Sequence, residues 1–180
     1  MWMPSRSQSG DSRVSVASTT MATNREAEKA AREREIFTEF AATAGLRLVP
    51  GSIVSRPVPE PDILCQLEGQ GAVAFELVEL IDEGLARSIS CADGSGVWVG
   101  DRTLEMVRTK LKTKKYETEY PLELLAYADI DLLLPEDVWM PGFEQLLVQM
   151  LNGSAFRRLW VFVSAASRKP ARIRFVHPSL

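Results

Sequence analysis

Apolar residues dominate two neighbouring segments between residues 62 and 81, and the sequence Glu-Gly-Gln-Gly separates them. Both segments are short and rich in residues typical of strands, and the glycines permit the tight turn of a hairpin. We therefore predict strands over residues 62–67 and 72–81, joined as a β-hairpin. The second segment is apolar on both faces, which indicates a central strand of a sheet rather than an edge strand.

Apolar residues with a period of three to four predict three helices. The first runs over residues 25–44, with Asn24 as its N-cap and Gly45 as its C-terminal cap. The others run over 101–116 and 141–151. The remaining apolar segments predict strands over 46–49 (continued over 52–54), 122–128, 159–164 and 172–176. This order of elements predicts an α/β domain in which helices flank a mixed central sheet of about five to six strands.

Composition adds limits to this interpretation. Residues 1–22 are rich in Ser, Thr and Arg without an apolar core, so we expect a disordered extension before a single domain over 23–180. Met21 is an alternative translation start, which the intact mass of the native protein would test. No apolar run approaches the ~20 residues of a membrane-spanning helix. Two cysteines and one histidine do not form a disulfide framework or a zinc site, which favours a reduced, cytoplasmic protein.

Carboxylates stand at unusual places in the hairpin. Asp62 begins the first strand and Glu76 lies inside the second, where an unpaired ionised carboxylate is costly to bury. A two-residue turn would pair Asp62 with Leu77, whereas a three-residue turn would pair it with Glu76. Two opposed carboxylates call for a cation, and a shared divalent metal would supply it. The alternative is that Asp62 caps the turn after Pro61 and that Glu76 and Glu79 face solvent at a sheet edge.

A helix bearing glutamates, a Pro-Asp pair at a strand start, a Gly-rich turn and a strand with a buried glutamate together resemble the PD-(D/E)XK phosphodiesterase superfamily, which has the restriction-endonuclease-like fold. The resemblance covers roughly residues 25–165. It implies that Asp62 and Glu76 bind Mg²⁺ or Mn²⁺. It also implies that a glutamate of the first helix assists, either Glu39 or Glu35.

The lysine of that family belongs two residues after the strand glutamate, and Val78 occupies that position here. Some members carry the lysine on the following helix instead. Extending the apolar stripe of helix 101–116 by three and four residues reaches Lys114 and Lys115, which are therefore the candidate cationic helpers. The alternative is that these lysines only complement the helix dipole and solvate the surface.

The sequence thus predicts a metal-dependent nuclease that hydrolyses DNA or RNA. The alternatives are a catalytically inactive nuclease-like domain that binds nucleic acid or protein, and an interaction protein whose carboxylates are structural. The net charge of −3 requires a local basic patch or a metal for a nucleic-acid partner. A homodimer or a partner protein is also expected, and a membrane partner is not. The basic residues near the C-terminus form either a phosphate-contacting surface or a solvated strand face: Arg157, Arg158, Arg168, Lys169, Arg172 and Arg174.

Overall fold

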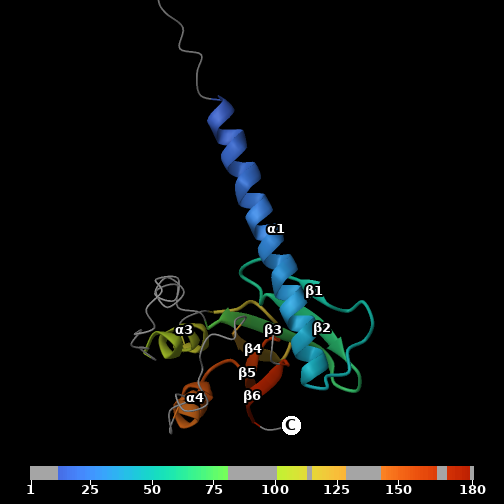
Figure 1. Cartoon of the computed structure of the whole chain (residues 1–180), viewed down its shortest axis with the longest axis vertical. Coiled ribbons are helices and arrows are strands. Elements are labelled where there is room, and N and C mark those ends of the chain that lie inside the picture. Colours follow the sequence, from blue (N-terminus) through green and yellow to red (C-terminus); the bar gives the residue numbers. More distant parts are fainter. Residues whose placement is uncertain (1–11, 81–100, 113–114, 129–142, 166–169, 179–180) are drawn as a thin grey trace, which may run out of the picture.

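The structure of the chain is a computed structural model that describes residues 12–80, 101–112, 115–128, 143–165 and 170–178. Within these ranges three helices flank a mixed six-stranded sheet, which confirms the predicted α/β class (Figure 1). The helices are α1 (Ser12–Thr43), α3 (Asp101–Lys112) and α4 (Phe143–Leu151). The strands are β1 (Val54–Ser55), β2 (Ile63–Leu67), β3 (Gly71–Glu79), β4 (Leu122–Ala128), β5 (Arg158–Val163) and β6 (Arg172–His177).

The strands lie side by side in the order in which they occur along the chain, from β1 to β6. The pairs β3–β4 and β4–β5 are parallel, and the pairs β1–β2, β2–β3 and β5–β6 are antiparallel. The central strands β3, β4 and β5 are almost completely buried, as expected for strands covered on both faces.

The turn between β2 and β3 decides between the two registers that the sequence left open. Leu67 pairs with Gly71, so three residues form the loop, and Gly69 has a φ of 76° that favours glycine. Ile63 pairs with Phe75 at the other end of the ladder. One step further along, Asp62 therefore stands opposite Glu76.

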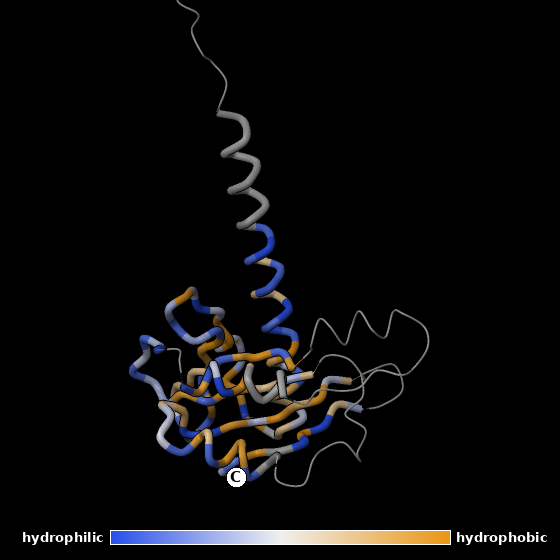
Figure 2. The backbone as a smooth tube through the Cα atoms, turned by 90° about the vertical axis from the view of Figure 1, so that its left-hand side faces the viewer, coloured by the Kyte–Doolittle hydropathy of each residue, from blue (hydrophilic) through white to orange (hydrophobic). Residues whose placement is uncertain are grey.

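Each face of the sheet has its own hydrophobic core. On one face, α1 packs the buried side chains of Ile36, Phe37 and Phe40 against residues of β2 to β5. On the other face, α3 and α4 cover the sheet with a second buried set that includes Val107 and Leu147. Figure 2 shows that the strands between the two cores are largely hydrophobic. A side chain in the central strands thus faces either α1 or the pair α3 and α4.

The main departure from the sequence prediction is the start of the first helix. The expected N-cap, Asn24, lies inside α1, because the helix begins at Ser12, within the segment predicted to be disordered. From Ser12 to Thr43 the sequence contains neither glycine nor proline that would end a helix. The N-terminal part of α1 projects away from the sheet (Figure 1). Two other departures are smaller. The strand expected over 46–49 is reduced to a single bridge between Leu48 and Leu67. The helix expected over 101–116 ends at Lys112, so that Lys115 and Tyr116 are not helical.

None of the helices in the described ranges is both long enough and apolar enough to cross a membrane.

Candidate active site

Asp62 is fixed at the start of β2 by its backbone and by its side chain. Its carbonyl oxygen accepts a hydrogen bond from the amide of Arg56 at 3.0 Å. Its carboxylate oxygen Oδ2 accepts another from the amide of Leu77 in β3 at 2.9 Å. The side chain is 11% exposed. These bonds join Asp62 to the neighbouring strand at the level of Glu76.

Glu76 is the most deeply buried carboxylate of the site, with an exposed fraction of 0%. It lies in the middle of β3 on the face that α3 covers, because Phe75 and Leu77 on either side of it belong to the core under α1. Lys110 of α3 reaches it, and its ammonium group Nζ forms an ion pair with Oε1 of Glu76. The Lys110 side chain is 26% exposed, so it extends from the surface to a buried partner.

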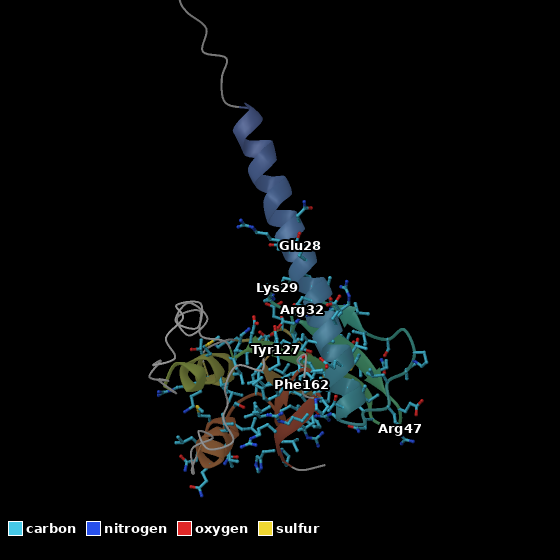
Figure 3. The ribbon with its side chains drawn as sticks, in the orientation of Figure 1. Glu28, Lys29, Arg32, Arg47, Tyr127 and Phe162 are labelled. Atoms are coloured by element: carbon cyan, nitrogen blue, oxygen red, sulfur yellow. The ribbon has the colours of Figure 1, made fainter. Side chains whose placement is uncertain are left out.

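A third carboxylate comes from α1. Glu33 is only 8% exposed, and Lys29, one helical turn before it, lies with its Nζ 2.5 Å from Oε1 of Glu33. The same ammonium group lies 3.5 Å from Oδ1 of Asp62. Figure 3 shows Lys29 on the part of α1 that reaches the edge of the domain. Lys29 thus links the helix to the start of β2.

The pKa of Glu33 is raised in the folded protein. Burial is the largest cause, the hydrogen bond from Lys29 opposes it, and the negative charges of Asp62 and Glu76 raise the pKa further. For Lys29, burial lowers the pKa, but the bonds and charges of Glu33 and Asp62 outweigh burial and raise it overall. The charges of Asp62 and Glu76 therefore act on the carboxyl group of Glu33.

Tyr116, which follows α3, closes the site on the side of Glu76. Burial is the largest cause that raises the pKa of its hydroxyl, followed by the negative charge of Glu76 and, more weakly, that of Asp62. Its ring packs edge-on against Phe156, with the ring centroids 5.5 Å apart. The hydroxyl therefore stays protonated at neutral pH and can donate a hydrogen bond.

The donor chemistry of the site fits a hard divalent cation. The three carboxylates carry a formal charge of −3 and the two lysines +2, so these five groups leave one negative charge in excess. In the described part of the chain, no three His, Cys, Asp or Glu side chains are arranged to hold a metal among themselves. Mg²⁺ is commonly held by only one or two carboxylates together with water and substrate phosphates. Asp62 and Glu76 supply that number.

The structure distributes the other predicted residues differently. Glu39 accepts hydrogen bonds from the Ser164 hydroxyl at 2.5 Å and from the Ala165 amide at 2.9 Å, at the end of β5. Glu35 is exposed and pairs with Arg32 at 3.3 Å. The lysine that contacts Glu76 is Lys110, whereas Lys115 is exposed. Lys114 lies outside the described residues.

Val78, at the position of the family's lysine, is a core residue. It is 6% exposed and packs in the cluster that α3 and α4 form with the sheet. An ammonium group at this position would be buried in an apolar environment, so the cation that faces Glu76 comes from α3.

Glu33 and Lys110 were not predicted from the sequence, although their helical spacing places each of them on a buried helix face. Glu33 precedes Phe37 by four residues and therefore shares the buried face of α1. Lys110 follows Val107 by three residues and shares the face of α3 that covers the sheet. The spacing was a usable signal, but it does not tell which turn of the helix crosses the hairpin.

A separate buried carboxylate accounts for two of the basic residues near the C-terminus. Glu123 of β4 is 1% exposed and accepts a hydrogen bond from the indole nitrogen of Trp160 at 2.6 Å. Arg157 contacts its Oε1 at 2.8 Å, and Arg158 lies 3.5 Å from the same atom. These two arginines therefore compensate a buried charge of the protein itself.

Comparison of the chain with models of protein families, with curated proteins and with solved structures finds no match.

Proposed function

We propose that this chain is a metal-dependent nuclease that hydrolyses phosphodiester bonds of DNA or RNA, with Asp62 and Glu76 as the ligands of Mg²⁺ or Mn²⁺. The observation that carries the proposal is that Asp62 stands opposite Glu76, whose carboxylate pairs with the Lys110 ammonium group. Lys29 in addition joins Glu33 of α1 to Asp62. The resemblance to the PD-(D/E)XK superfamily implies a lysine beside the acidic metal ligands, and the pairing of Lys110 with Glu76 supports this. Lys110 of α3 would take the role of the family's lysine, whose position in β3 is occupied by Val78.

Each residue has a role that its surroundings support. The bound metal would neutralise charge on the phosphate and lower the pKa of a water molecule. Asp62 is oriented by the Leu77 amide, so its carboxylate is preorganised rather than free to rotate. Lys110 carries the positive charge that would stabilise the negative charge developing on the phosphate oxygens. Glu33, held by Lys29, would orient water from the α1 side.

A second candidate function has an observation of its own in favour. Lys110 already pairs with Glu76, and Lys29 with Glu33 and Asp62, so most of the acidic charge is compensated by the protein itself. Such a site suits a nuclease-like domain that no longer cleaves and instead binds nucleic acid or a protein. In either case a reducing cytoplasmic setting is part of the proposal, supported by the buried free thiol of Cys65.

Cleavage assays separate the two candidates. The purified protein is incubated with labelled single- and double-stranded DNA and RNA in Mg²⁺, Mn²⁺ or EDTA. We expect cleavage that requires the metal and falls by at least about a hundredfold in Asp62→Asn and Glu76→Gln, because a buried carboxylate ligand is lost from each. Lys110→Met should lower the cleavage rate with less effect on metal affinity.

Glu68→Gln serves as the matched control, because Glu68 is an exposed glutamate in the turn of the same hairpin. It should cleave like the unaltered protein. Melting temperatures of all variants, measured with and without Mn²⁺, establish that each is folded and whether it binds metal. Equal background cleavage in every variant, with no shift in melting temperature on adding Mn²⁺, would reject the nuclease and leave the non-catalytic domain.

A further inference from the structure

A cavity of about 660 Å³ lies between the C-terminal ends of α3 and α4. Its wall combines apolar side chains, two lysines and the turn after α4: Leu111, Lys112, Lys115, Tyr116, Met150, Asn152, Gly153, Ser154 and Ala155. The volume falls in the range of sites for small ligands. None of the proposed metal ligands belongs to the wall, so the cavity is distinct from the carboxylate site.

The charges of the wall select the class of ligand. Lys112 and Lys115 are both exposed, and the lining residues within the described ranges include no carboxylate. Asn152 and Ser154 add neutral polar groups. In a chain with a net charge of −3, a hollow whose described wall carries two lysines favours an anion.

Three local contacts hold the walls of the cavity in place. The turn after α4 is closed by hydrogen bonds from the Asn152 amide to the Val148 carbonyl at 3.1 Å and from the Ser154 amide to the Leu151 carbonyl at 3.0 Å. On the opposite wall, the ring of Tyr116 is held edge-on by Phe156. A wall built in this way does not need to be ordered by the ligand, which lowers the entropic cost of binding.

Tyr116 connects the cavity with the carboxylate site. It lines the cavity, while the charges of Glu76 and Asp62 act on its hydroxyl. On α3, Lys110 points to Glu76 and Lys112, two residues later, lines the cavity. The positive charges thus continue from the carboxylate site to the cavity along one end of one helix.

We propose that this cavity holds a phosphate-bearing nucleotide of the substrate strand, adjacent to the bond that is cleaved. That the nucleotide belongs to a substrate rests on the proposed nuclease function. Its binding to the cavity needs neither metal nor cleavage. Lys112 and Lys115 contact the phosphate groups, and Tyr116 forms the partition between this nucleotide and the metal ligands. A 5′-phosphorylated single-stranded end is the ligand that uses all three residues.

Binding without metal tests this assignment. The probe is the 5′-phosphorylated thymidine trinucleotide with a 3′ fluorophore, titrated with the full chain in EDTA at low salt. Its affinity should fall at least about tenfold in the double variant Lys112→Ala/Lys115→Ala, because two charge-assisted phosphate contacts are lost. The dependence of the affinity on salt should become shallower by about two counterions. Inorganic phosphate should compete with the probe, and thymidine should not.

A variant that fills the cavity distinguishes binding inside the cavity from non-specific attraction to exposed lysines. Ala155→Trp leaves both lysines in place but occupies the cavity from an exposed position of its wall, and it should also weaken binding at least about tenfold. Arg47→Ala removes an exposed positive charge near the C-terminal end of α1, well away from α3 and α4 (Figure 3), and should change the affinity less than twofold. Melting temperatures confirm that each variant is folded.

The outcomes are distinct from those of the cleavage assay. Lysine-dependent binding that Ala155→Trp leaves intact would overturn the cavity site, and so would equal binding by all variants. Binding in EDTA that both sets of variants abolish would support the cavity even if no nucleic acid is cleaved. Cleavage that is unchanged in the cavity variants would support the nuclease and reject this role of the cavity.

Discussion

At the scale of single residues, the burial of Glu76 dominates the energetics of the candidate site. An ionised carboxylate with no exposed surface is tolerated only when a cation compensates it, and Lys110 does so. Glu123 of the neighbouring strand β4 repeats the same principle on the opposite face of the sheet, with two arginines and an indole. Glu76 and Lys110, which are proposed to act in catalysis, therefore also determine the stability of the fold.

Lys110→Met should lower the free energy of unfolding by about 3 kcal/mol, because Glu76 loses its ion pair inside the protein. Glu76→Gln alone should cost less, since the amide can still accept a hydrogen bond from Lys110. Urea unfolding of both single variants and of the double variant gives the coupling energy. Strictly additive effects would contradict a direct interaction between the two side chains.

The sequence led to Asp62 and Glu76 because a carboxylate in an apolar strand is unusual in itself. It did not lead to Glu33 and Lys110, because Glu39 and Lys115 are as acidic and as basic as they are. Only the crossing of α1 and α3 over the sheet decides which helical turn faces the hairpin. That crossing depends on packing across long sequence separations, which the spacing of residues within one helix does not contain.

At the scale of elements, α1 consists of two parts with different surroundings. Ile36, Phe37, Phe40 and Ala41 are buried, whereas residues 24–29 are all exposed. Figure 2 shows the corresponding change from hydrophilic to mixed residues along the helix. The helix is therefore attached to the domain by its C-terminal part.

Phe40→Ala should lower the free energy of unfolding by about 3–5 kcal/mol, the usual cost of removing a fully buried phenylalanine. Phe40 is 0% exposed and its ring lies between 5.1 and 6.0 Å, centroid to centroid, from the rings of Phe37, Phe75, Trp160 and Phe162. Glu28→Ala on the exposed part of the same helix should change it by no more than about 0.5 kcal/mol. Chemical denaturation measures both, and similar losses would contradict this division of α1.

The sequence predicts an element well where the element is apolar on all its faces. The strand over 122–128 is found with the predicted bounds, because it is apolar on both faces and a proline precedes it. The start of α1 was missed because helix-forming residues continue on both sides of Asn24, so a possible cap did not act as one. Short strands such as β1 depend on a partner strand more than on their own sequence.

At the scale of the whole molecule, several groups whose pKa is raised in the folded protein give the free energy of unfolding a common dependence on pH. Burial, followed by the charge of Glu123, raises the pKa of the Cys65 thiol from 9.0 to about 12. The pKa values of Tyr116 and Lys29 are also raised in the folded state. In each case the unfolded chain releases its proton at a lower pH than the folded protein does.

The free energy of unfolding should therefore be constant with respect to these groups below pH 9 and decrease as the pH rises from 9 to 12. A single group contributes at most about 1.4 kcal/mol per pH unit. Cys65→Val removes one of the groups and should make this decrease shallower, as urea unfolding at a series of pH values will show. A stability that rises over this interval would contradict the assigned directions of the pKa shifts.

The order of the strands has a consequence for how the protein is made. Each described strand pairs with the one synthesised just before it, so the sheet can grow from β1 to β6 in step with translation. One set of long-range contacts joins α1 to the late strand β5: Glu39 binds Ser164 and Ala165 after β5, and Phe40 packs against Trp160 and Phe162. Because α1 precedes the six described strands, these contacts cannot form until β5 has been synthesised. Until then the aromatic face of α1 depends on the earlier strands for cover.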